Sequence, residues 1–406
     1  MSPAPSKSDV LIVGGGMAGL CAAISAHKAG AKVRILEASP RHLRGGNLRH
    51  ARNIRIPHGD ISPHSPGIYP AEEFARELFE VSGGEGDVAL IEVLASRAAE
   101  LGEWLAGQGV VFQAKHIPFS RRTAFFLGGG KAAANALYAR VEALGISVSY
   151  ETPWDIDDLH ALRSSVVVLC CGGDQADARH RFINRGTPFN KGAPMEGLIR
   201  AGAAVAGVAA AAHLVAVDAR SPRHDGGIAT RIDGMQFGMM VDDQGRRFID
   251  ETAIAGSRRY SIWGQTIAAL PLSRAMLVLD VDGMAAMPRL AFDPIRTKNL
   301  DEMAALIEVD SAALVCSAQQ SGRVKKPPFF SYPVVPGLTF SCHGLQVDTR
   351  ARIKMRDGSV SKNLLAAGAI MAPAILHTGY LSGTALTISA VFGRIAGEEA
   401  ARHALG

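Results

Sequence analysis

The stretch that decides the fold is residues 9–38, DVLIVGGGMAGLCAAISAHKAGAKVRILEA. It begins with a short apolar run, Val10–Val13, which ends in three consecutive glycines. Good helix formers at helical spacing follow over residues 17–31, and a second apolar run, Lys32–Leu36, ends at the acidic Glu37. A strand, a glycine turn, a helix and a second strand in immediate succession predict the opening of a parallel α/β sheet.

The glycines of this turn fit the GxGxxG fingerprint, with Gly14, Gly16 and Gly19 at its three positions. In that motif the glycines permit a tight turn, close approach of the backbone to a pyrophosphate and close helix–sheet packing. The pyrophosphate then lies on the amides at the positive end of the helix. Glu37 closes the second strand, where a carboxylate accepts hydrogen bonds from ribose hydroxyls. The sequence therefore predicts that the chain binds a dinucleotide.

The composition is that of a globular chain with an ample core. Of the 406 residues, 48% are hydrophobic and 20% are charged, and the length fits two or three domains. The net charge of +5 is spread along the chain, which argues against a nucleic-acid partner or a membrane-surface role. A mild positive excess fits anionic small molecules instead.

The five cysteines form no CxxC pair, so they predict no zinc site, iron–sulfur cluster or disulfide framework. An odd count without a pattern predicts reduced thiols in a cytoplasmic protein. The longest apolar stretch, residues 201–217, is shorter than the ~20 residues that a membrane-spanning helix needs. We expect it to form a packed helix end followed by a buried strand, in a soluble protein with no membrane span.

A change in the pattern of predicted elements along the chain indicates two domains. From about Asp218 the alternation of strands and helices gives way to a helix-rich stretch, punctuated by prolines up to Pro336. After it the first pattern returns. We therefore expect one domain built from residues 1–217 and 341–406, with a second domain, residues 218–340, inserted between them.

Within the first domain the apolar spacing predicts further elements. Residues 71–106 predict two helices, and residues 166–169 predict a strand. Residues 363–367 predict another strand, and residues 384–402 predict the last helix.

Several glycine-rich segments beyond the first carry a family resemblance. Gly172 and Gly173 follow one apolar run, and another apolar run ends at Gly368. This pattern resembles the FAD flavoproteins of the fumarate reductase/succinate dehydrogenase superfamily and, within it, the FAD-dependent tricarballylate dehydrogenases. The resemblance covers most of the chain and rests on GGGMAGLCAA, RGGNLRHARNIR, FFLGGGKAAANALY, RGTPFNKG, DGGIATRIDGMQFG, GRRFIDE, RRYSIWG, PGLTFSCHGLQVD, LAAGAIMA and FGRIAGEEAARH.

The resemblance implies an α/β fold: a GR2-type, Rossmann-like FAD-binding domain with an inserted α+β capping domain for the substrate. It implies non-covalent FAD, because Gly46 stands where relatives with a covalent flavin have the linked histidine. Ala369 replaces a glutamate that binds the ribityl hydroxyls in many relatives. The implied cofactor-binding residues are Gly14, Gly16, Met17, Ala18, Glu37, Ala38, Arg44, Gly45, Gly46, Asn47, Gly172, Gly173, Gly368, Gly383, Thr384, Ala385 and Leu386.

The resemblance also implies the chemistry, which is oxidation of a carbon–carbon bond beside a carboxylate. A base removes the α-proton, and flavin N5 accepts the β-hydride. The family takes a proton-transfer arginine from the segment after GRRFIDE, which here is Arg259 or, as second choice, Arg258. A guanidinium is protonated at ordinary pH. Such an arginine is therefore either strongly perturbed or mainly an electrostatic clamp, with Tyr260 and Tyr380 as alternative proton acceptors.

The substrate-binding positions differ from those of fumarate reductases. Arg231 stands where those enzymes have a proton-relay glutamate, and a third guanidinium suits a third carboxylate. Their histidine corresponds to Thr339 or Phe340 here, and their arginine to Tyr380. The expected substrate-binding residues are Arg231, Thr230, His343, Thr339 and His377, whereas His50, Arg52 and Arg55 fit either the mouth of the site or a loop-stabilising role.

The implied reaction converts tricarballylate into aconitate. Two rivals stay open: a related flavoprotein acting on another polycarboxylate or a corrin-pathway tetrapyrrole, and a flavin-binding protein without turnover. Because the sequence shows no cluster ligands of its own, we expect a separate iron–sulfur or membrane protein to accept the electrons. The expected location is the cytoplasm, at the inner face of the membrane where that partner holds the protein.

Overall fold

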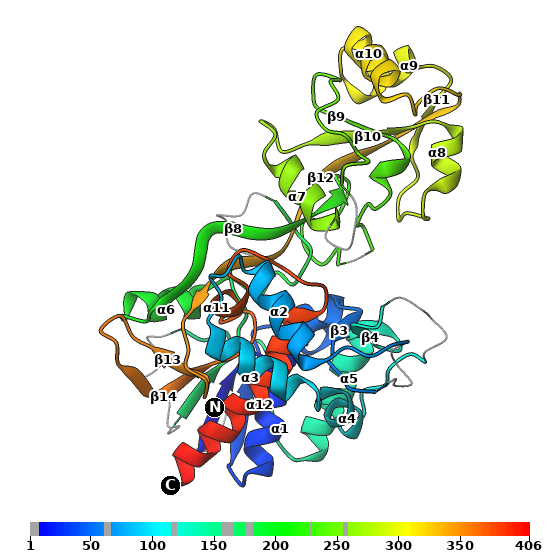
Figure 1. Cartoon of the computed structure of the whole chain (residues 1–406). Helices are drawn as coiled ribbons and strands as arrows, with labels where there is room; N and C mark the ends of the chain where they lie inside the picture. Colours follow the sequence, from blue (N-terminus) through cyan, green and yellow to red (C-terminus); the bar gives the residue numbers. More distant parts are fainter. Residues whose placement is uncertain are drawn as a thin grey trace. The chain divides into compact units, whose positions relative to one another are not determined.

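The computed structural model describes residues 8–60, 66–114, 120–155, 166–174, 182–227, 229–254 and 259–406. The chain divides into two compact units, which are described separately (Figure 1). The first unit contains Met1–Asp177, Thr187–Ala212 and Phe340–Gly406, and the second contains Ala178–Gly186 and His213–Thr339. The role of residues 218–340 as a cap over the cofactor stays a prediction.

A six-stranded sheet forms the centre of the first unit. Its strands, in spatial order, are β13 (Arg352–Lys354), β14 (Val360–Ala366), β6 (Val166–Leu169), β1 (Val10–Val13), β2 (Val33–Leu36) and β5 (Ser147–Ser149). All neighbours pair in parallel except β13, which is antiparallel to β14. Every side chain of β1 and β6 is buried, as expected for central strands covered on both faces.

Two long helices pack closely against each other beside this sheet. They are α1 (Met17–Lys28), which follows the glycine turn, and α12 (Thr384–Leu405), the last helix (Figure 1). Gly393 and Gly397 of α12 lie directly on the backbone of α1, because a Cβ at either would collide with the carbonyl of Ala18 or Ala22. The absence of side chains at these two positions lets the helix axes approach.

Residues 71–106 form three helices, not the two expected. They are α2 (Ala71–Val81), α3 (Val88–Ala98) and α4, which begins at Leu101 and ends at Gly107. The first break lies at Gly83 and Gly84, which have φ angles of +68° and +83° and so favour glycine. Asp87 then caps α3 by accepting a hydrogen bond from Leu90 N at 3.2 Å.

The remaining elements of the first unit lie around the sheet and support its loops. They are the 3-10 helices η1 (Arg41–Leu43) and η2 (Gly46–His50), the hairpin of β3 (Asn53–Arg55) and β4 (Thr123–Phe125), and the helices α5 (Gly129–Ala143), α6 (Ala193–Arg200) and α11 (Pro373–Leu376).

The second unit has a mainly antiparallel sheet at its centre, whereas the sequence indicated a helix-rich region. The sheet order is β11 (Ile295–Thr297), β12 (Phe329–Leu345), β10 (Ala275–Leu279) and β9 (Met239–Val241), and β7 (Ile183–Asn184) and β8 (Val205–Asp218) also pair with β12. The helices are α7 (Arg259–Ala268), α8 (Val281–Ala286), α9 (Leu300–Ile307) and α10 (Ser311–Ser321), with the 3-10 helix η4 (Met235–Phe237).

The sequence indicated a strand at residues 238–241, which is β9, and strand β10 shows why the rest of this sheet gave little sequence signal. All five of its side chains are buried. Leu277 and Leu279 belong to a core cluster with Trp263 of α7, whereas Met276 and Val278 belong to a second cluster with residues of α9 and α10. Burial on both faces removes the alternation of polar and apolar residues that marks a half-exposed strand.

The alanine-rich stretch at residues 201–217 only partly matches its prediction. Helix α6 ends at Arg200, and β8 begins at Val205. The end of β8 is buried as expected, but Val205 and Val208 are 37% and 40% exposed. The prediction of a buried strand was wrong for this first part, because small apolar side chains are tolerated at the surface.

Candidate functional site

The turn between β1 and α1 is shaped by its glycines. Gly14 has a φ angle of +100°, and a Cβ there would lie 2.5 Å from the carbonyl oxygen of Cys170. A Cβ at Gly19 would collide with the carbonyl of Gly14. Gly16 is the N-cap of α1 and offers no side-chain cap to the first amides of the helix. The positive end of α1 is therefore open to an anion.

A second glycine segment lies against this turn. A Cβ at Gly46 would be 3.7 Å from Gly16 Cα, and a Cβ at Gly16 would be 3.8 Å from the carbonyl oxygen of Gly45. Asn47 continues the segment, and its Oδ1 accepts a hydrogen bond from Thr187 N at 2.9 Å. Two stretches about thirty residues apart in the sequence thus form one cradle of glycine backbone without side chains.

Glu37 is held in a fixed position at the end of β2. It is 5% exposed and accepts hydrogen bonds from Gly15 N at 2.9 Å and Ser39 N at 2.8 Å. Tyr138 donates a hydrogen bond to the Gly15 carbonyl at 2.9 Å, and burial raises the pKa of this phenol. The Arg44 guanidinium lies 4.3 Å from the Tyr138 ring centroid. Ala38 is half-buried next to Glu37.

The start of α12 is tied to the same region. Gly368 has a φ angle of +91°, and a Cβ there would be 2.9 Å from Ala18 Cβ of α1. Gly383, with a φ angle of +81°, is the N-cap of α12, and a Cβ there would be 2.7 Å from Arg55 N. The first turn of α12, which contains Thr384, Ala385 and Leu386, therefore begins at a closely packed backbone.

Arg55 has a structural role, because its hydrogen bonds hold the start of α12 in place. Its Nε donates to the Ser382 carbonyl at 3.1 Å, and its Nη1 donates to Glu77 at 2.8 Å and to the Tyr69 hydroxyl at 2.9 Å. Thr387 of α12 donates to the Arg55 carbonyl at 2.6 Å. Of the two roles open to Arg55, these contacts favour stabilisation of the loop.

Three features of this region fit FAD. The cradle at Gly16 and Gly46 leaves room where side chains would otherwise stand, and the α1 N-terminus has no side-chain cap. The buried hydroxyls of Ser39, next to Glu37, and of Thr384, in the first turn of α12, have no hydrogen-bond partner among the described residues. Buried polar atoms of this kind are normally satisfied, and a polar ligand would satisfy them.

Of the remaining expected residues, Tyr380, His377 and His343 belong to the first unit. The Tyr380 ring centroid lies 5.4 Å from that of Phe340. His377 ends α11 with a φ angle of +50°. His343 is buried in β12, and Gly172 and Gly173 follow β6, where a Cβ at Gly172 would meet the Asn190 side chain.

The second unit holds the other expected substrate residues. Arg231 pairs with Asp233, the Nη2–Oδ2 distance being 3.1 Å, and Thr230 is buried. The Thr339 hydroxyl accepts a hydrogen bond from Arg185 Nη1 at 2.7 Å. Arg185 is 9% exposed, and its Nε donates to the Gly227 carbonyl at 3.0 Å.

The proposed proton-transfer arginines are only partly covered by the structure. Arg259 begins α7, but its side chain lies outside the described residues, and so does the whole of Arg258. Ser261 of α7 lies 3.2 Å from His213 of β8, measured from Oγ to Nδ1. Burial and the charge of Arg185 lower the pKa of His213 to about 3, so the imidazole is neutral at ordinary pH.

Sequence reasoning did not assign a role to Arg185 or His213. Arg185 lies in the quoted stretch RGTPFNKG, but an isolated arginine gives no sign of burial. His213 lies in an apolar run, where a histidine was expected only to interrupt the hydrophobic stretch. Both become visible when β7, β8 and β12 pair in one sheet.

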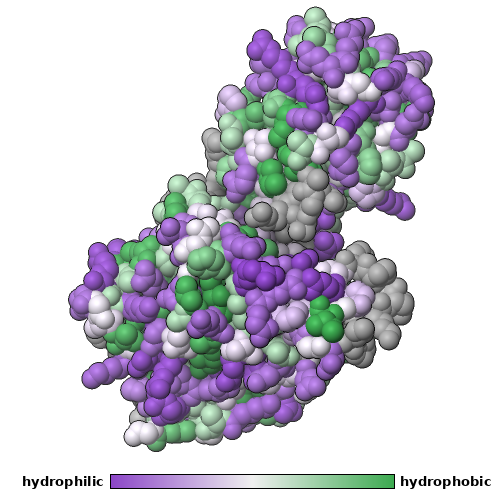
Figure 2. Space-filling view, viewed as in Figure 1, coloured by the Kyte–Doolittle hydropathy of each residue, from purple (hydrophilic) through white to green (hydrophobic). Residues whose placement is uncertain are grey.

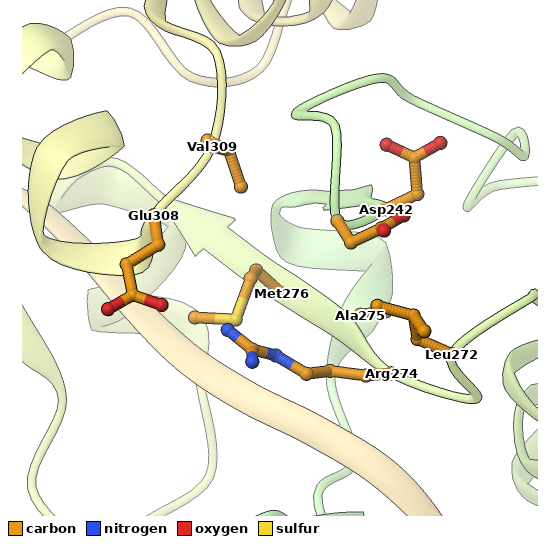
Figure 3. A pocket seen from close by; sticks show the side chains of 8 residues that line it. Asp242, Leu272, Arg274, Ala275, Met276, Glu308 and Val309 are labelled. Carbon is orange, nitrogen blue, oxygen red and sulfur yellow. The ribbon is translucent and has the colours of Figure 1, made fainter.

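A separate cavity of about 250 Å³ lies in the second unit (Figure 3). Its charged lining residues include Asp242, Arg274 and Glu308, and in Figure 3 the Arg274 guanidinium lies beside Met276. None of the expected site residues lines this cavity, so we assign no cofactor or substrate role to it.

A parallel sheet with a glycine turn, a buried acid at the end of β2 and an uncapped helix N-terminus defines a dinucleotide-binding flavoprotein fold. The sequence matches the family described as FAD binding domain, over residues 9–147 and 133–386. The chain belongs to this family.

Two curated relatives are fumarate-reducing enzymes by name. A fumarate reductase (cytochrome) of Shewanella frigidimarina is 23% identical over 97% of this chain and 77% of that protein. An NADH:fumarate oxidoreductase of Klebsiella pneumoniae is 23% identical over 99% of this chain and 48% of that protein.

Solved structures show the same fold. A 3-ketosteroid delta1-dehydrogenase of Sterolibacterium denitrificans has a TM-score of 0.78 at 17% identity, over 97% of this chain and 99% of that chain. The open form of a flavocytochrome c3 fumarate reductase has a TM-score of 0.76 at 20% identity, over 99% of this chain and 79% of that one. The predicted fold class, FAD as cofactor and an FAD-dependent oxidoreductase are confirmed.

Figure 2 shows hydrophilic and hydrophobic residues interspersed on the face that it draws. Within the described ranges, every helix is too short or too polar to cross a bilayer.

Proposed function

We propose that the chain oxidises a carbon–carbon bond beside a carboxylate in a small polycarboxylate, and that tricarballylate is oxidised to aconitate. Membership of the FAD-binding family and the fumarate-reducing relatives support the reaction class. The main support for a carboxylate substrate comes from Arg185. This residue is nine-tenths buried, and its guanidinium group is hydrogen-bonded to the expected substrate residue Thr339. A buried guanidinium with a fixed orientation is suited to bind a carboxylate.

The cofactor would be held by the cradle described above. The amides at the start of α1 bind the diphosphate, and Glu37 accepts hydrogen bonds from ribose hydroxyls. FAD bound there supplies the hydride acceptor for the reaction. The positive end of α12, at Thr384, stabilises negative charge placed before it by ~0.3–1 kcal/mol or more.

The chain's own residues would bind the substrate and move one proton. Arg231 and Arg185 orient carboxylates, and a base accepts the proton from the carbon next to a carboxylate. We assign this proton transfer to Arg259, at the start of α7, with Arg258 and Tyr380 as alternatives. The hydride leaves the neighbouring carbon, so one double bond forms as one proton and one hydride depart.

The electrons would pass on to a separate protein. No cysteine pattern in the sequence supports a cluster of the chain's own. We propose an iron–sulfur or membrane-bound acceptor, and a cytoplasmic location at the inner face of the membrane.

A dye-coupled dehydrogenase assay over a panel of acids tests this function. The panel contains tricarballylate, citrate, succinate and a corrin-type tetrapyrrole, and flavin content is measured in the same samples. We expect turnover with tricarballylate at a kcat/KM above that for succinate. Turnover only with succinate or with the tetrapyrrole would overturn the assignment of tricarballylate as the substrate. Full flavin content with no turnover on any acid would overturn the reaction.

A further inference from the structure

Three side chains with metal-binding atoms meet in the first unit. Asp174 follows Gly173 after β6, Glu196 lies in the first turn of α6, and His343 lies in β12. One ligand atom from each lies within 4.8 Å of the other two. His343 Nδ1 is 3.8 Å from Glu196 Oε1 and 4.0 Å from Asp174 Oδ2.

Two of the three groups are buried, Glu196 is partly exposed, and the histidine is not satisfied. Asp174 is 1% exposed and His343 is 8% exposed. His343 Nδ1 has no hydrogen-bond partner among the residues that the structure describes. Its distances to the two carboxylates exceed the range of an N–H···O hydrogen bond. A buried nitrogen without a partner, aimed between two carboxylates, leaves a place for a positive group.

The backbone around the cluster is closely packed. Gly192, the N-cap of α6, lies against Asp174, because a Cβ there would be 2.6 Å from Asp174 Cβ. Gly344, next to His343, lies against the carbonyl of Ile370. Asp174 N donates a long hydrogen bond to Ser341 Oγ at 3.5 Å. The segment of Asp174 is therefore held against the start of α6, through Gly192, and against β12, through Ser341.

We propose that Asp174, Glu196 and His343 bind one divalent transition-metal ion, with Zn²⁺ as the best fit. One imidazole nitrogen and two carboxylate oxygens are a ligand set that Zn²⁺ accepts at about 2.0–2.2 Å. The double positive charge of the ion balances two carboxylates beside a neutral imidazole.

The distances between the ligand atoms fit a bound Zn²⁺ if the three side chains move slightly closer together. Two ligand atoms at about 2.1 Å from a tetrahedral ion lie roughly 3.4 Å apart, against 3.8 and 4.0 Å here. Three protein ligands leave a fourth position for water or a ligand oxygen. The ion would join the end of β6, helix α6 and strand β12 in one site, whatever the substrate of the enzyme.

The test measures zinc binding to the purified flavoprotein after treatment with EDTA. Elemental analysis gives the bound zinc per chain, and competition with a chelating dye gives the affinity. The variants are Glu196→Gln, Asp174→Asn and His343→Gln, which keep side-chain size nearly unchanged. Glu72→Gln is the matched control, because Glu72 is an exposed glutamate in the first turn of another helix, α2. Flavin content is recorded throughout, so loss of FAD is distinguished from loss of the metal.

We expect one tightly bound Zn²⁺ per chain in the wild type and in the control. Each ligand variant should bind it at least about 10–100-fold more weakly, since even loss of an outer partner costs that much. If a ligand variant fails to fold, the remaining two decide. Equal affinity in the wild type and the folded ligand variants would overturn the proposal. So would thermal stability that responds to neither Zn²⁺ nor EDTA, which would indicate an imidazolium paired with the two carboxylates.

Discussion

At the scale of single residues, the cofactor cradle was the most predictable part of the protein. Gly14, Gly16 and Glu37 carry their signal in local spacing, and the structure brings them together. Arg185 and His213 could not be found in this way, because their burial arises from strand pairing between distant segments. The roles of the expected substrate residues stay predictions.

Substitution of the proposed proton-transfer arginine is the first prediction. Arg259→Lys should lower kcat by about 10²–10⁴-fold, the range for loss of a positioned proton-transfer group. Lysine keeps the charge but loses the planar fork that holds a carboxylate. The turnover rate and the flavin absorption spectrum are measured on the same sample, and the spectrum should stay unchanged. Arg258→Lys is the control and should be milder. An essential Arg258 beside a dispensable Arg259 would show that the assignment is shifted by one residue.

The preference for a third carboxylate should depend on Arg231. An unpaired carboxylate in a water-poor site costs ~2–5 kcal/mol, which is roughly a 30- to several-thousand-fold loss. Arg231→Ala should therefore lower kcat/KM for tricarballylate far more than for succinate, and Arg231→Glu should add repulsion. The measured quantity is the ratio of the two kcat/KM values. A ratio that neither substitution changes would mean that Arg231 has a structural role, such as its pairing with Asp233.

His213 should make the stability of the fold depend on pH. Its pKa is lowered to about 3 in the folded chain, whereas an unfolded histidine titrates near 6.5. The unfolded state therefore binds more protons between these values. The contribution of neutral His213 to the free energy of unfolding is fully present above about pH 6.5. It is lost as the pH falls toward 3, by up to ~1.4 kcal/mol per pH unit.

Denaturant unfolding at several pH values measures this effect. His213→Gln should flatten the dependence between about pH 6.5 and 4. His403→Gln, at an exposed position in the last turn of α12, serves as the control and should leave the dependence unchanged. Equal slopes for the wild type and His213→Gln would contradict the assignment.

At the scale of elements, the sequence was informative where burial and glycine turns coincide. The bounds of β1 and β6 were predicted as they occur, because both are apolar runs that end at a turn. The region of α2–α4 was predicted with one helix too few, since α3 and α4 are divided only at Ala99 and Glu100, where no glycine or proline marks the break. Most of the sheet of the second unit was missed, because strands such as β10 are buried on both faces.

The packing of α1 on α12 leads to a prediction about two helical glycines. Gly397→Ala places a methyl group against the Ala22 carbonyl and should destabilise the fold by about 1–3 kcal/mol. Gly107→Ala, at an exposed helical position with nothing within 4 Å of the new Cβ, should stabilise it by about 0.5–1 kcal/mol. Thermal and denaturant unfolding of both variants give the comparison. Effects of the same sign and size would contradict the close helix contact.

At the scale of the whole molecule, the family and the cofactor follow from the first unit. Its sheet, the glycine turn and the start of α12 lie within one compact unit, and we propose that they hold the FAD. The metal ligands Asp174, Glu196 and His343 come from three segments of that unit with no common motif. Local sequence patterns could not have predicted that these three residues lie together, because only the fold brings the segment after β6, helix α6 and strand β12 close to one another.

The measurement that tests the central claim most directly is the flavin content of the purified protein. The cradle predicts about one FAD per chain, with the absorption bands of a bound flavin. Because Gly46 offers no atom for a covalent link, denaturation should release all of the FAD into the supernatant. A protein that is purified without flavin and cannot be reconstituted with FAD would contradict the account.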